Sequence, residues 1–333
     1  MSTTLYPPVP RGANLESLLE LNRLNELRSH LAYLLTTISS LTTGLSECLD
    51  LLKPFSPGNT LVLSSSKARL ESKNESIKGY VTRLGAEIIR ADLRVNMPAL
   101  RGGGGRFTLI SSSRETDDDP PDKDNGDHGG ILLRQMVELQ RAVDRALSLV
   151  DVPSWTGDRQ DAHYVRGQVR MLGECLEEGQ AIINGQAGRD PWPHNPGLDH
   201  RSFVPPLPPN LHADVFLFNA CITIELRTLD PVDSIATSIS TLTSKFSTAL
   251  GGALKSPLHD EVGRVFTLPE QISPPGSSPR SAGKREVRVR EKIIVESADP
   301  HLLAVRSKLD ALKRSVDFLR WGLEVLMGYA DQE

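Results

Sequence analysis

The chain has 333 residues, of which 38% are hydrophobic and 24% charged, and its formal net charge is −4. This balance is ordinary for a soluble protein and gives no general electrostatic reason to bind nucleic acid or an acidic membrane. The residues before Arg11 lack the basic and apolar regions of a signal peptide, and no run of about 18 apolar residues predicts a membrane-spanning helix. Three widely separated cysteines, Cys48, Cys175 and Cys221, are typical of reduced thiols in a cytosolic protein.

The first predicted element is a long helix over residues 14–53. Its apolar residues follow one another at alternating steps of three and four, which is the spacing of a heptad seam. They are Leu24, Leu27, Leu31, Leu34, Ile38, Leu41, Leu45, Cys48 and Leu52. Leu21, Leu35 and Leu49 widen the stripe. A stripe of this width favours a core-facing helix of a bundle over a narrow two-stranded zipper.

Two regions change to a period of two and predict antiparallel strands. In residues 60–110, the apolar residues from Ile89 to Met97 alternate with polar ones, as in a strand with one solvated face. The run Gly102 to Gly105 is interpreted as a flexible linker, because it lacks the context of a phosphate-binding loop. In residues 211–297, a long strand over 215–227 with a bulge near Asn219 to Cys221, a short helix at 235–246 and a last strand over 287–295 are predicted.

Helical spacing returns in residues 130–187 and 299–329. The first of these ranges predicts an antiparallel helical hairpin with a break near Pro153. In the second, Asp299 before Pro300 suits a helix N-cap. The fold class is therefore predicted as α+β: an antiparallel four-helix bundle (14–53, 130–187 and 299–329) closed by the N- and C-terminal helices, plus a small antiparallel β-sheet domain (60–110 and 211–297) built from two insertions.

Three segments, 1–13, 111–129 and 270–284, contain too few apolar side chains to form a core and are predicted to be disordered. Asp117 to Asp119 could hold Ca²⁺, but their spacing fits no EF-hand, and a solvated acidic loop is the interpretation we favour.

Two blocks of sequence resemble a known family. They are GYVTRLGAEIIRADLRVNMP (79–98) and PPLPPNLHADVFLFNACITIELRTLDP (205–231). With a leucine-rich helix at each end, they are similar to the Rogdi family of leucine-zipper-containing proteins, which includes the second subunit of the fungal RAVE complex. The resemblance covers roughly residues 14–329.

The resemblance implies a non-enzymatic subunit that promotes assembly and reassembly of the vacuolar proton-pumping ATPase. The implied partners are a large β-propeller (WD-repeat) subunit, a Skp-type adaptor and the cytosolic sector of the pump. The implied location is cytoplasmic, with peripheral association at vacuolar or endosomal membranes and only indirect membrane contact. Neither a nucleic-acid partner nor a cofactor is expected.

The residues themselves give no catalytic, cofactor-binding or metal site. The eight histidines never pair with cysteine at ligand spacing, and no serine lies in a GxSxG elbow. The candidate partner-binding residues are Arg288, Arg290 and Lys292, which alternate with Val287 and Val289. This pattern fits either the solvated face of a strand or a sheet edge that pairs with an acidic partner surface.

Two other classes of function stay open. A coiled-coil scaffold or tether subunit of membrane-trafficking machinery would predict an elongated molecule with open heptads, although the two period-two regions argue against it. An enzyme would need a cluster of polar residues at strand ends, and the sequence does not indicate one.

Overall fold

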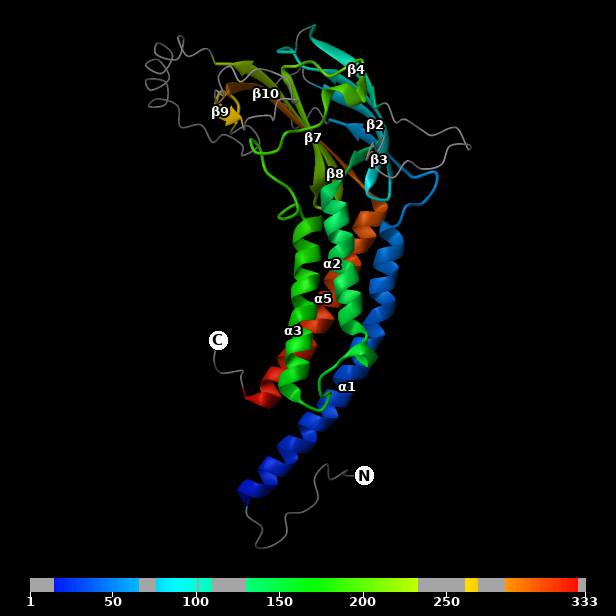
Figure 1. The fold of residues 1–333 in the computed structure, drawn as a ribbon, viewed down its shortest axis with the longest axis vertical. Helices are drawn as coiled ribbons and strands as arrows, with labels where there is room; N and C mark the ends of the chain where they lie inside the picture. Colours follow the sequence, from blue (N-terminus) through cyan, green and yellow to red (C-terminus); the bar gives the residue numbers. More distant parts are fainter. Residues whose placement is uncertain are drawn as a thin grey trace, which may run out of the picture. The chain divides into compact units, whose positions relative to one another are not determined.

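The structure, a computed structural model, describes residues 15–65, 76–100, 102–109, 130–232, 261–268 and 285–328. The segments 1–13, 111–129 and 270–284, predicted to be disordered, and the short helix predicted at 235–246 lie outside the described residues. Figure 1 shows the helices and strands.

The chain divides into two compact units. The first comprises Met1–Leu51, Gln140–Gln180 and Ala304–Glu333, and the second comprises Leu52–Leu139 and Ala181–Leu303. The first, called the helical unit below, contains most of α1 (Leu15–Leu52), α2 (Arg134–Val150), α3 (Ala162–Ile183) and α5 (Pro300–Met327). The second, called the sheet unit, contains the strands. Two short 3₁₀ helices, η2 (Val152–Ser154) and η3 (His200–Ser202), lie in the connections.

In the helical unit, α1 and α5 run antiparallel. Arg23 donates a hydrogen bond to the carbonyl of Leu326 at 3.1 Å, and Lys308 pairs with Glu47. The beginning of each helix thus lies beside the end of the other. The helices also approach closely at Gly44, where a Cβ atom would lie 3.0 Å from the side chain of Leu312. The apolar seam of α5 is buried from Leu302 through Leu323, as its spacing predicts.

The predicted α+β class is correct, but the predicted closed four-helix bundle with one small sheet is wrong. The seam of α1 is buried only from Leu31 onward, and Leu21 and Leu24 are 53% and 43% exposed. The helical unit takes in only residues 140–150 of α2 and 162–180 of α3. The strands form two antiparallel sheets instead of one. A heptad pattern identifies residues able to pack, but it does not reveal whether a neighbour covers them.

The first sheet is antiparallel and has the strand order β1-β2-β3-β4-β6, with β5 also paired to β3. The strands are β1 (Asn59–Ser64), β2 (Ser76–Leu84), β3 (Glu87–Asn96), β4 (Gly104–Leu109), β5 (Ile131–Leu132) and β6 (Phe203–Val204). In β3, Ala91, Leu93 and Val95 are buried, whereas Arg90 and Arg94 are exposed. This confirms the one-sided alternation predicted for this strand.

The second sheet has the antiparallel order β7-β8-β10-β9. Its strands are β7 (Leu211–Phe218), β8 (Cys221–Pro231), β9 (Val265–Leu268) and β10 (Arg285–Ala298). The predicted long strand with a bulge at 219–221 is wrong, because β7 and β8 are joined there by a two-residue hairpin turn. Asn219 and Ala220 have φ of 51° and 60°, the backbone conformation that such a turn requires. The slip in the alternation therefore marks a reversal of the chain.

Each period-two region forms its own sheet, and side chains connect the two sheets within the sheet unit. Ser297 donates to the carbonyl of Val62 at 2.9 Å, and Glu291 accepts the backbone N–H of Ala99 at 3.0 Å. The most buried link is the ion pair of Arg83 with Asp299, whose side chains are 2% and 0% exposed.

Asp299 also begins α5. Its Oδ1 accepts the backbone N–H of His301 at 2.9 Å and that of Leu302 at 3.4 Å, so the predicted N-cap is confirmed.

We expect Asp299→Ala to lower the free energy of unfolding by about 3–5 kcal/mol, because Arg83 would stay buried without its carboxylate partner. Urea unfolding followed by circular dichroism measures this loss. The matched control is Asp230→Ala, since Asp230 pairs with Arg290 at the surface and both side chains are exposed. An exposed pair contributes less than about 1 kcal/mol. Equal losses for the two variants would contradict the assignment of Arg83–Asp299 as the dominant ion pair.

Candidate functional site

The candidate partner-binding residues on β10 do not form one exposed face. Val287 and Val289 are 1% and 0% exposed and belong to the core. β10 pairs with β8 along its length and with β9 through Arg285–Arg288. The backbone of Val289 also exchanges hydrogen bonds with Gly263 and Arg264. From Val287 to Val289 the strand is therefore paired on both sides, although the sequence suggested an open edge there.

Lys292 belongs to a charged cluster made of Glu225, Arg227, Glu261 and Lys292. Its Nζ lies 2.7 Å from Glu225 and 3.0 Å from Glu261, and its side chain is only 10% exposed. Arg227 contacts the same two carboxylates at 2.9 and 2.7 Å. Burial raises the pKa of Glu261, but the hydrogen bonds and charges of Arg227 and Lys292 outweigh it and hold that pKa below its usual value. The cluster is thus an internal ion network of the second sheet.

The other two basic residues of the candidate set are more accessible. Arg290 pairs with Asp230 at the surface, where its side chain is 57% exposed. Arg288 is half-buried, and its Nε atom lacks a hydrogen-bond partner.

A second basic surface lies on the outer face of the first sheet. Lys78, Arg94 and Arg106 are directly opposite one another on β2, β3 and β4, and all three are exposed. Arg90 is exposed on the same side of β3, four residues before Arg94. We call these four residues the basic face. The sequence showed that the polar residues of β3 face solvent, but it could not show the register that aligns cations from three strands.

One carboxylate lies on this face. Asp92 accepts two hydrogen bonds from the Arg106 guanidinium, at 2.9 and 2.5 Å. Hydrogen bonding by Arg106 lowers the pKa of Asp92, with a smaller contribution from the charge of Arg94. Among the described residues, the ion pairs of the basic face are limited to this one.

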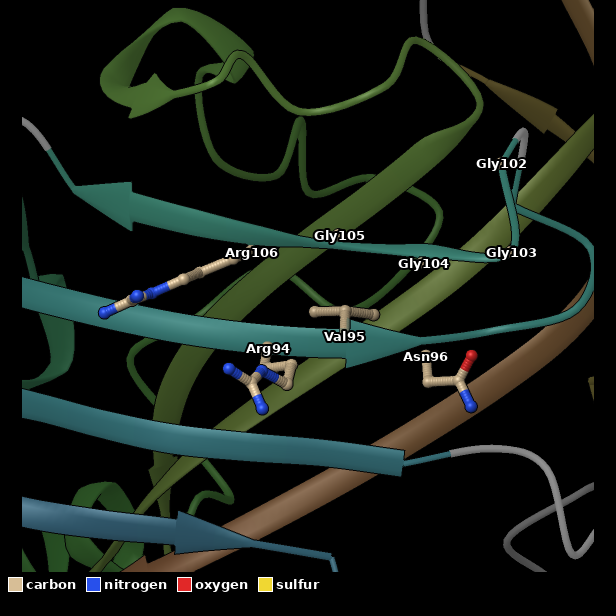
Figure 2. A pocket seen from close by; sticks show the side chains of 8 residues that line it. All are labelled: Arg94, Val95, Asn96, Gly102, Gly103, Gly104, Gly105 and Arg106. Carbon is tan, nitrogen blue, oxygen red and sulfur yellow. The ribbon is translucent and has the colours of Figure 1, made fainter.

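The turn before β4 leaves open space beside these arginines. Gly102 and Gly103 have φ of 94° and 74°, and a Cβ atom at either position would meet nothing within 4 Å. Arg94, Asn96 and Arg106 line this hollow of about 490 Å³ together with the turn, as Figure 2 shows. The run predicted as a flexible linker consists of a turn at Gly102 and Gly103 and the first two residues of β4, Gly104 and Gly105. In the turn, the N–H of Gly103 donates to the carbonyl of Leu100 at 2.8 Å.

The family model for Rogdi leucine zipper containing protein matches residues 27–324. This match covers most of the chain and parts of both compact units. The chain belongs to the Rogdi family. A search of curated proteins found no match. The family is not a known enzyme family.

In this Rogdi-family chain the helical unit also exposes aromatic side chains. Tyr33 of α1 and Phe318 of α5 line a groove of about 330 Å³. Trp321 lies next to Phe318, with ring centroids 6.4 Å apart, and all three side chains are exposed. Clustered apolar exposure of this kind marks interaction surfaces in many proteins.

Within the described ranges, no three or more His, Cys, Asp or Glu side chains are arranged to hold a metal ion. None of the helices described is long and apolar enough to cross a membrane.

We expect Lys292→Glu to destabilise the Rogdi-family fold by about 3–5 kcal/mol, because it adds a third carboxylate beside Glu225 and Glu261 and removes their cation. Arg290→Glu is the matched control on the same strand and should cost less than about 1 kcal/mol, since its ion pair is exposed. Denaturant unfolding of both variants tests this. A native-like midpoint for Lys292→Glu would refute the structural role of the cluster.

A pH dependence is expected from His212. Burial lowers the pKa of this histidine to about 4, against the hydrogen bond that its ring makes with the Asn195 carbonyl. The unfolded chain, with a pKa of about 6.5, binds the proton first as pH falls, so stability should decrease between about pH 6.5 and pH 4. His212→Gln should reduce the decrease in unfolding free energy between pH 7 and pH 5. An unchanged decrease would show that other groups cause it.

Proposed function

We propose that this chain is a non-enzymatic subunit of a RAVE-type complex that promotes assembly and reassembly of the vacuolar proton-pumping ATPase through protein–protein interaction. The observation that carries the proposal is the Rogdi family match over residues 27–324. Because that match takes in residues of both the helical unit and the sheet unit, it supports a function of the whole chain.

The proposed partners are a large β-propeller (WD-repeat) subunit, a Skp-type adaptor and the cytosolic sector of the pump. The proposed location is cytoplasmic, with peripheral association at vacuolar or endosomal membranes. We propose Arg288 and Arg290 as partner contacts in the second sheet. The partial exposure of these two arginines supports this. Lys292 instead forms ion pairs with Glu225 and Glu261 inside the sheet, and Val287 and Val289 are buried in the core.

The test is made in cells in which the Arg288→Glu/Arg290→Glu variant replaces the wild-type chain. We expect folded protein, weaker co-purification of the β-propeller subunit and slower vacuolar reacidification after the pump has been disassembled. The control, Arg134→Glu/Arg201→Glu, makes the same charge change at exposed positions elsewhere in the sheet unit. If the wild-type chain fails to co-purify the β-propeller subunit, the proposed function is wrong. If the wild-type chain co-purifies the β-propeller subunit and the Arg288→Glu/Arg290→Glu variant does so equally well, the proposed contacts are wrong.

A coiled-coil scaffold of trafficking machinery is the second candidate, and the exposed leucines of α1 favour it. Leu21 and Leu24, three residues apart and so on one side of the helix, are exposed in its first turns. A partner helix could cover this stripe, since apolar residues at helical spacing are the usual contacts between helices. Recovery of tether subunits instead of pump subunits in the same co-purification would support this candidate.

A further inference from the structure

Among the described residues, the cations of the basic face outnumber the carboxylates that pair with them. Lys78, Arg94 and Arg106 are directly opposite one another on neighbouring strands, and Arg90 extends the row along β3. Four cations and the single carboxylate of Asp92 give this face a charge of +3 (four minus one). The chain as a whole carries −4, so the face contrasts with the rest of the molecule.

This arrangement works against the stability of the sheet. Like charges directly opposite on adjacent strands repel, whereas neutral β-branched residues at the same positions would favour the strands. Thr60 and Thr82, opposite each other on the same face, show the neutral alternative: their hydroxyls lie 3.0 Å apart in a hydrogen bond. Where a protein retains an unfavourable surface arrangement, a binding role is a common reason.

The surroundings of the cations fit a protein partner. Val62 and Tyr80 are aligned with Asp92 in the next row of the face, and they are 73% and 41% exposed. Arginine, tyrosine and apolar side chains together are typical of interface cores. Gly102 and Gly103, which carry no side chains, line the hollow together with Arg94, and Figure 2 shows these residues.

We propose that the basic face is a docking site for an acidic polypeptide segment of a partner protein. Charge complementarity identifies the occupant. The two hydrogen bonds that the Arg106 guanidinium donates to the Asp92 carboxylate are an example, within this face, of how an arginine binds a carboxylate. Arg94, Arg90 and Lys78 present the remaining cations to the carboxylates of the partner. The site goes beyond the proposed contacts of β10, which lies in the other sheet.

An anionic membrane is the less favourable occupant. Each basic residue near an anionic bilayer strengthens binding by only about fivefold, so three net charges give about a hundredfold. Stable attachment needs a larger basic cluster or a second anchor. Close charge pairs across protein interfaces strengthen binding by about tenfold or more each. The same three charges therefore suffice for a protein partner more readily than for a membrane.

The test compares two triple variants of the full chain that make the same charge change. Lys78→Gln/Arg90→Gln/Arg94→Gln removes cations of the basic face, and Arg28→Gln/Arg134→Gln/Arg201→Gln removes exposed cations elsewhere. The probes are a fluorescent peptide that alternates Glu and Thr, and vesicles that contain phosphatidylserine. We expect the first variant to bind the peptide at least tenfold more weakly than wild type and to melt at an equal or higher temperature. The control variant should bind nearly as well as wild type.

A second variant is expected to bind the peptide more tightly than wild type, a result that loss of folding could not produce. Asp92→Asn removes the only carboxylate of the described basic face and releases Arg106, so the peptide should bind several-fold more tightly, with a steeper dependence on salt. Equal weakening by both triple variants, or no gain for Asp92→Asn, would overturn the proposal. Tighter binding to the vesicles than to the peptide would overturn it in favour of a membrane site.

Discussion

Asp299 accepts the Nε–H of Arg83 at 2.7 Å in a place that water does not reach, and three parts of the sheet unit meet at this carboxylate. Arg83 comes from the end of β2, and Asn59 at the start of β1 donates to the same side chain at 3.4 Å. The backbone N–H of Asp299 reaches Ala220 in the β7–β8 hairpin. Because a buried charge without its partner is strongly unfavourable, the carboxylate ties both sheets and the first turn of α5 to one geometry.

Arg83 is held from a second direction, since its NH1 donates to the carbonyl of Gly85 at 2.6 Å. Gly85 begins the turn between β2 and β3 and has φ of 59°, a conformation that glycine adopts without strain. The position of this one guanidinium thus depends on a turn of the first sheet and on the helix cap that follows the second. Single substitutions at this site should disturb distant strands together, unlike those at an exposed ion pair.

Local patterns in the sequence predicted the features that depend on one segment. The N-cap at Asp299, the apolar seam of α5 and the one-sided alternation of β3 follow from residue type and spacing alone, and the structure confirms them. Features that depend on a neighbour were missed. Leu24 of α1 has the spacing of a seam but is exposed, and Leu27 is only half-buried. The turn at Asn219 was interpreted as a bulge, because a slip in alternation looks the same whether the strand continues or reverses.

The same limit applies to the charged residues. Lys292 and Arg94 each lie in a strand where basic and apolar residues alternate, yet Lys292 is held between Glu225 and Glu261, whereas Arg94 lies between Lys78 and Arg106. Strand register decides which carboxylate or cation stands opposite, and register is set by pairings far apart in sequence. Neutralised cations such as Lys292 stabilise the sheet that contains them. Cations aligned with other cations weaken their own sheet, and an acidic segment of a partner, as we propose for the basic face, would offset this repulsion.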